Sequence, residues 1–95
     1  MPAFVTLINY SAEGAKGISA ERTKKVDDFL KAAKGKFIAG YGLLGRYDGL
    51  LICELPSEKA ALKFALQLSR LIGAKTETMV GIPLEAFDKL AAETK

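Results

Sequence analysis

The sequence contains no histidine, no tryptophan and a single cysteine, Cys53. Without histidine the chain lacks the commonest general base and the commonest metal ligand, and a His-ligated haem or a phosphohistidine intermediate is excluded. One cysteine forms no intramolecular disulfide and no thiolate metal site of its own. We therefore expect no metal, no cofactor and a reducing, cytoplasmic location.

A strong charge of one sign and a long hydrophobic run are also missing. The net charge is +3, because 14 lysines and arginines stand against 11 acidic residues. The lysines of residues 24–36 are interleaved with Asp27 and Asp28, which is typical of a solvated helix face rather than of a nucleic-acid footprint. No apolar stretch approaches the roughly 20 residues that cross a bilayer, and no secretory signal opens the chain. We expect neither a nucleic-acid nor a membrane partner.

What the sequence does contain is 49% hydrophobic residues in a chain of 95, which suits one domain over residues 1–95. Bulky and β-branched runs predict strands over 3–10, 37–44, 50–55 and 76–82. Residues 11–17 and 45–49 carry turn residues and are expected to be loops, the second with an Asp-Gly hairpin signal.

Two helices are expected between these strands and a third after them. Ser19 is a natural N-cap for the first, and Gly35 is placed where a glycine would end it. Ser57 caps the second and Gly73 ends it, around a clear apolar stripe. Pro83 begins a short terminal helix with Leu84, Phe87, Leu90 and Ala91 on one side.

The resulting order is βαββαβ with a C-terminal helix. This is the α+β, ferredoxin-like or split βαβ arrangement, with an antiparallel four-stranded sheet. The strands are apolar on both faces, whereas two helices cover only one face, and an antiparallel sheet with a wet face should alternate apolar and polar residues. We therefore predict a homodimer through the sheet, a dimeric α/β barrel, with the terminal helix able to shield only part of the face.

Three segments carry a family resemblance. They are the opening run at 4–10, the Gly45-Arg46-Tyr47-Asp48 hairpin, and Thr76-Glu77-Thr78. On these the chain resembles the GYD-domain proteins, named for the Gly-Tyr-Asp signature. The resemblance implies a dimeric α/β barrel and leaves the biochemical role open, since the wider group includes cofactor-free monooxygenases, haem enzymes, small isomerases and amino-acid-sensing domains.

The hairpin residues Arg46, Tyr47 and Asp48 are candidate ligand-binding residues. In one interpretation they line a pocket in which Arg46 binds an anion. In the other they form a turn, in which Gly45 supplies an unusual φ and Asp48 bonds to nearby backbone.

Asn9, Tyr10 and Tyr41 are polar groups on apolar strands and are further candidates. They either orient a small ligand or are half-buried packing residues with wet hydroxyl groups. Gly40 and Gly42 interrupt the second strand, which indicates either a bulge or the close approach of a bulky group, preferably from a partner.

The remaining reactive residues carry weaker signals. Glu54 and Glu77 are either acid–base groups in apolar surroundings or exposed strand residues. Cys53 reads as a small buried hydrophobe, because no histidine is present to activate it. Residues 14–17 precede a helix but lack the phosphate-loop pattern, so a surface loop is expected.

No segment amounts to a catalytic motif, so the sequence leaves open whether the protein is an enzyme. The third strand lacks the basic and aromatic residues with which RNA-recognition domains stack bases. The first hypothesis is a binding or sensing domain for a small, mostly apolar or anionic molecule. The alternatives are a cofactor-independent monooxygenase or isomerase acting on a small cyclic substrate, and an assembly protein without a ligand.

Overall fold

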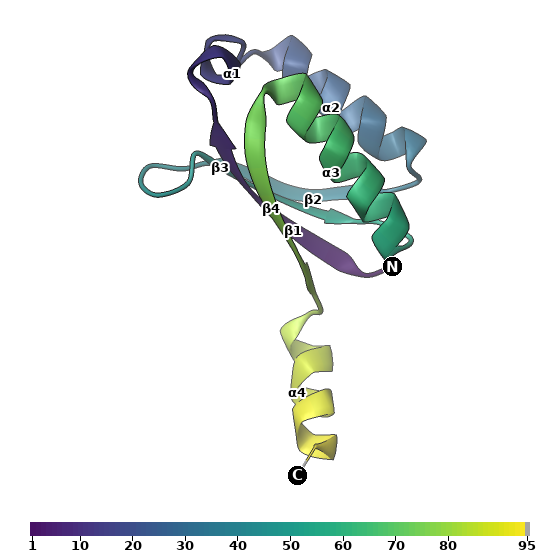
Figure 1. The fold of residues 1–95 in the computed structure, drawn as a ribbon. Helices are drawn as coiled ribbons and strands as arrows, with labels where there is room; N and C mark the ends of the chain where they lie inside the picture. Colours follow the sequence, from purple (N-terminus) through teal and green to yellow (C-terminus); the bar gives the residue numbers. More distant parts are fainter. Residues whose placement is uncertain (95) are drawn as a thin grey trace.

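The computed structural model describes residues 1–94 and has two layers (Figure 1). Its elements are β1 (Ala3–Tyr10), α1 (Ala12–Lys16), α2 (Ala20–Ala32), β2 (Lys36–Gly42), β3 (Gly49–Glu54), α3 (Glu58–Ile72), β4 (Ala74–Gly81) and α4 (Leu84–Glu93). The strands form one antiparallel sheet in the order β2-β3-β1-β4, and α2 and α3 lie on one face of it. The predicted fold class, βαββαβ with a C-terminal helix, is confirmed.

The core lies between the sheet and the two long helices. Alternation places one set of strand residues toward the helices, where Phe4, Ile8, Leu51 and Cys53 are buried. The stripe of α3 completes the core with Ala61, Phe64, Leu68 and Ile72. Thr6 is the buried polar residue of this layer, and its hydroxyl group shares a 3.1 Å hydrogen bond with that of Thr78.

The opposite side of the sheet has no helix over it (Figure 1). We call it the open face. Register places its central apolar residues on the same side of three paired strands and on β4, namely Val5, Leu7, Ala39, Leu50, Ile52 and Met79. One corner is polar, because Asn9 pairs with Lys75 and Leu7 with Glu77. The face is therefore apolar in its middle but not throughout.

Helix α3 begins and ends where the sequence predicts. The Ser57 side chain accepts a hydrogen bond from the Ala60 amide, and Gly73 adopts the left-handed conformation, with φ of 60°. Ser19 likewise caps α2, through the Arg22 amide. At the other end, α2 stops shortly before Gly35, as expected, but Lys34 is the residue in the left-handed conformation, with φ of 61°. Gly35 is needed for space instead, because a Cβ there would lie 2.7 Å from Leu30 Cδ1.

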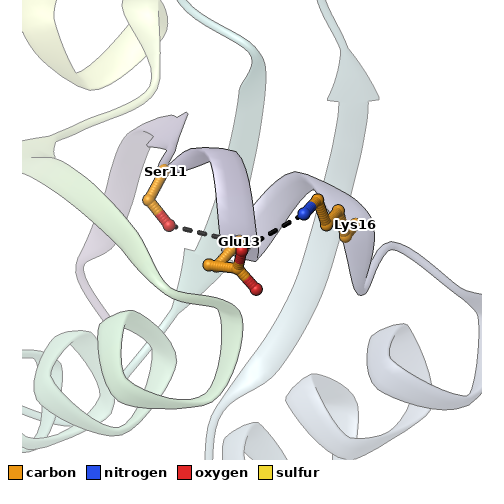
Figure 2. A network of polar contacts seen from close by, with 4 residues as sticks. Ser11, Glu13 and Lys16 are labelled. Atoms are coloured by element: carbon orange, nitrogen blue, oxygen red, sulfur yellow. Dashed lines mark hydrogen bonds and ion pairs between the residues drawn. The ribbon is translucent and has the colours of Figure 1, made fainter.

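Residues 11–17 contain a short helix rather than a loop. Ser11 accepts a hydrogen bond from the Gly14 amide, and Lys16 pairs with Glu13 one turn along at 3.2 Å (Figure 2). The Ser11 hydroxyl group also donates to the Gly73 carbonyl at 2.8 Å, which ties α1 to the end of α3. The Gly14 amide is therefore already hydrogen-bonded within the fold.

Strand β2 ends earlier than predicted, at Gly42, so Leu43 and Leu44 belong to the connection. A bulge lies between Phe37 and Ala39, not at the glycines. Gly40 is explained by close approach, because a Cβ there would lie 3.1 Å from Phe37 Cζ. The bulky group comes from the same chain, whereas we expected it from a partner.

Strand β4 begins at Ala74, two residues before the predicted start. Helix α4 forms as predicted after Pro83, but it continues away from the body of the molecule (Figure 1) and does not cover the open face.

Candidate functional site

A cavity of about 310 Å³ lies between α2 and one end of the sheet. Its walls are mostly apolar and come from both long helices and three strands. They include Ile8, Ile18, Val26, Phe37, Leu51, Leu68 and Ile72. Tyr10, Tyr41, Arg22 and Asp48 also line it. A concave, mostly apolar volume with a few converging polar groups is typical of small-ligand sites.

Arg22 is the cation of this cavity, and the sequence analysis missed it. Its Nη1 donates to the Gly14 carbonyl at 2.7 Å, and its guanidinium group stands 5.4 Å from the centre of the Tyr10 ring. These contacts hold the planar group in one orientation at the cavity wall. A signal was present in the sequence: Arg22 lies in the first turn of α2, where the helix dipole disfavours a positive charge.

Asp48 connects β1 to the β2–β3 connection. Its Oδ2 accepts from the Tyr10 amide at 2.9 Å, and its own amide donates to the Ile8 carbonyl at 2.8 Å. Its carbonyl accepts from the Leu43 amide at 2.9 Å, which closes the connection. These backbone contacts agree with the turn interpretation of Asp48, and its place in the cavity wall keeps the binding interpretation open.

Tyr47 and Arg46 lie elsewhere in the same connection. The Tyr47 hydroxyl group donates to Glu77 Oε2 at 2.8 Å, and this bond, reinforced by burial and the charge of Glu77, raises the pKa of Tyr47. Arg46 stands 5.9 Å from the Tyr47 ring centre. Because Glu77 projects from the open face, Tyr47 reaches over β1 at the polar corner rather than into the cavity. Gly45 has φ of 129°, which a side chain would disfavour.

The structure thus divides the predicted candidates. Tyr10 and Asp48 come together at the cavity, whereas Tyr41 borders only its rim and pairs with Leu50 of the open face. Tyr47 lies with Glu77, and Asn9 has a register position on the open face beside Lys75. Within residues 1–94, neither Arg46 nor Asn9 lines the cavity.

Cys53 is 2% exposed, and its burial raises the pKa of the thiol to about 11. The folded state keeps the proton at pH values where the unfolded state loses it, so stability should fall as pH rises from about 9 to 11. We expect a slope of at most about 1.4 kcal/mol per pH unit from this group. Urea unfolding across this range checks it. A Cys53→Ala variant should show a shallower slope, and equal slopes would contradict the assignment.

Neither metal binding nor membrane crossing finds support in the described part of the chain. Residues 1–94 bring together no group of three histidine, cysteine, aspartate or glutamate side chains suited to a metal ion. No helix among them has the length and apolar character needed to cross a membrane.

The chain is similar to known proteins in sequence and in fold. A curated relative from Thermus thermophilus, a glutamine synthetase and cystathionine beta-lyase binding protein, is 30% identical over 87 residues, covering 88% of this chain and 92% of the relative.

Solved structures share the fold at lower identity. A feast or famine regulatory protein from M. tuberculosis, complexed with L-methionine, aligns with a TM-score of 0.64 at 8% identity over 87% of this chain. This chain spans 51% of that regulator's length. A hypothetical protein from Pyrococcus horikoshii aligns with a TM-score of 0.56 at 19% identity, covering 87% of this chain and 92% of the other.

The family assignment comes from the sequence match. The family model of the GYD domain covers residues 4–91, nearly the whole chain. The resemblance seen at the Gly45-Arg46-Tyr47-Asp48 hairpin is confirmed by this match, and the chain belongs to the GYD domain family.

Proposed function

We propose that this protein is a homodimeric domain that binds a small carboxylate with a mostly apolar body. One observation carries the binding part: a single oriented arginine, Arg22, stands in the wall of a mostly apolar cavity of about 310 Å³. Guanidinium groups bind carboxylates through two parallel hydrogen bonds, and the apolar wall suits the rest of such a molecule. The regulator of similar fold that is complexed with L-methionine supports a small-molecule role.

The polar groups around Arg22 favour binding over chemistry. The Tyr10 ring contacts the guanidinium group of Arg22, and the Asp48 carboxylate accepts a hydrogen bond from the Tyr10 amide. Tyr41 borders the rim of the cavity, but it pairs with Leu50, so its side chain lies on the open face of the sheet. In this proposal Arg22 takes the carboxylate, the apolar wall covers the body of the ligand, and Asp48 fixes the strand end.

Calorimetric titration of the full-length protein tests the proposal. The probes are isovalerate and phenylacetate, each beside its amide, and L-methionine. We expect at least one carboxylate to bind, and its amide to bind about tenfold or more weakly, because the charged pair is lost. Arg22→Gln should weaken carboxylate binding by a similar factor.

Arg46→Gln is the matched control. Arg46 is an exposed arginine outside the cavity wall, so its loss should leave affinity unchanged. Urea unfolding of both variants separates binding from stability, since Arg22 also bonds to the Gly14 carbonyl. Absence of binding by every probe, or loss through Arg46 instead of Arg22, would overturn this site.

A second candidate function is protein binding, because the curated relative is named for binding glutamine synthetase and cystathionine beta-lyase. Sedimentation of this protein mixed with each purified enzyme tests it. Co-sedimentation would favour a role in protein assembly, and independent sedimentation would favour the small-molecule role.

A further inference from the structure

Helix α4 has an apolar side with nothing packed on it. Leu84, Phe87 and Leu90 are 77%, 54% and 53% exposed, and none of the helix's residues is buried. Figure 1 shows α4 leaving the body as a separate arm. Helices of this length gain most of their stability from packing an amphipathic face. We therefore expect the apolar side of the arm to pack against another surface.

A second uncovered apolar surface lies on the body, between α3 and the edge strand β4. This groove, of about 280 Å³, is lined by Phe4, Glu58, Ala61, Leu62, Ala65, Thr78 and Val80. Leu62 and Leu66 are both exposed and stand one turn apart on α3, beside this groove. We call these residues the α3–β4 groove.

The two surfaces are continuous. A hollow of about 370 Å³ at the junction of β4 and α4 is lined by Val80, Gly81, Ile82, Leu84 and Phe87. Val80 belongs both to this hollow and to the α3–β4 groove. One apolar strip therefore runs from α3 across the edge strand onto the arm. Such a strip can pair with a copy of itself about a two-fold axis, because an isologous interface uses the same patch twice.

Charge favours the same pairing. The arm carries three acidic residues and one lysine, namely Glu85, Asp88, Glu93 and Lys89. Helix α3 carries Glu58 against three basic residues, Lys59, Lys63 and Arg70. At about 100° per residue, those basic residues flank the Leu62–Leu66 stripe, and Asp88 flanks the apolar side of the arm. Glu58 lines the groove itself, while the basic residues lie on the outer side of the Leu62–Leu66 stripe. The acidic arm can therefore meet these basic residues along the outer side of the stripe, which steers the pairing.

We infer that the occupant of the α3–β4 groove is α4 of a second copy of this chain, with each copy giving its arm to the other. The apolar side of the arm covers Leu62, Leu66 and Val80, and Asp88 lies near Lys59 and Lys63. This interface uses the arm and the edge of the helical layer, so it does not depend on pairing through the open face or on the ligand.

Cross-linking between separately purified variants tests the exchange. Leu62→Cys chains are mixed with Leu90→Cys chains and treated with a short bismaleimide. We expect a 62–90 cross-link between chains, with a yield at least severalfold above that from mixing Leu62→Cys with Lys89→Cys, whose cysteine lies on the opposite side of the arm. Wild-type protein reports any reaction of buried Cys53. Equal yields would overturn the inference.

A double variant, Leu62→Cys with Leu90→Cys, separates exchange from folding back. Cross-links confined to one chain would show that the arm covers its own groove, which contradicts the inference. Sedimentation velocity adds an independent measurement. Phe87→Glu should lower the mass of the assembly, while Lys89→Glu should leave it unchanged. The Ile52→Lys substitution places a charge in the middle of the open face. If the 62–90 cross-link still forms in that background, the arm interface does not depend on pairing through the open face.

Discussion

Replacing Gly14 with alanine is expected to destabilise the fold by about 1–3 kcal/mol or more, the cost of overpacking a site that cannot relax. Gly14 is buried where α1 crosses the end of α3. A Cβ there would overlap the carbonyl oxygens of Ile72 and Gly73. Those are backbone atoms at a helix terminus, so the clash is relieved only by separating α1 from α3. Urea unfolding measures the change.

Gly42→Ala is the control for that substitution. No heavy atom lies within 4 Å of a Cβ built at Gly42. The alanine should therefore change stability by less than about 0.5 kcal/mol, or raise it slightly by restricting the unfolded chain. A loss at Gly42 equal to that at Gly14 would mean that alanine itself, rather than the contact with α3, is responsible. Preserved stability in Gly14→Ala would show that α1 is not held in this position.

The sequence predicts those parts of the fold that local chemistry determines. Ser57 and Gly73 mark the ends of α3 because a cap and a left-handed glycine act within one turn of the helix. At the end of α2 the helix stops where it was expected to, but Lys34 takes the left-handed conformation, and Gly35 must be small because of contacts that only the tertiary fold supplies. The sequence alone does not reveal whether a glycine is required for a left-handed backbone conformation or for lack of space for a Cβ atom.

The candidate site was predictable only in part, for the same reason. Tyr10 stands out as a polar residue on an apolar strand and Asp48 as a residue of the hairpin, and the fold brings these two together. In the sequence, Arg22 is not distinguished from the other charged residues of its helix. Its contact with Gly14 joins residues from α1 and α2, and no periodicity encodes that contact. Arg46 lies outside the cavity, next to Tyr47, whose hydroxyl group is hydrogen-bonded to Glu77. Because this bond joins residues 30 apart in the sequence, the position of Arg46 was not predictable from local pattern.

Ile52→Lys is expected to abolish the proposed pairing through the sheet and to leave only the association through the exchanged α4 arms. Ile52 lies on an inner strand, opposite Val5 on one side and Ala39 on the other, in the apolar middle of the open face. Each large side chain on this face contributes roughly 1.5–3 kcal/mol when it is covered. Lysine would remove one such contribution and place a charge between two sheets. We expect the dissociation constant to rise by on the order of a hundredfold or more.

Sedimentation equilibrium at micromolar concentration measures this effect, with Leu44→Lys as the matched control. Leu44 is 104% exposed in the β2–β3 connection, so lysine there removes an apolar side chain that contacts nothing and should leave the mass unchanged. Circular dichroism of both variants checks that the subunit is folded, because Ile52 faces away from the core and its loss should not unfold it. A wild-type chain that is already a stable monomer would remove the physical basis for pairing through the sheet, since six apolar side chains would then tolerate water.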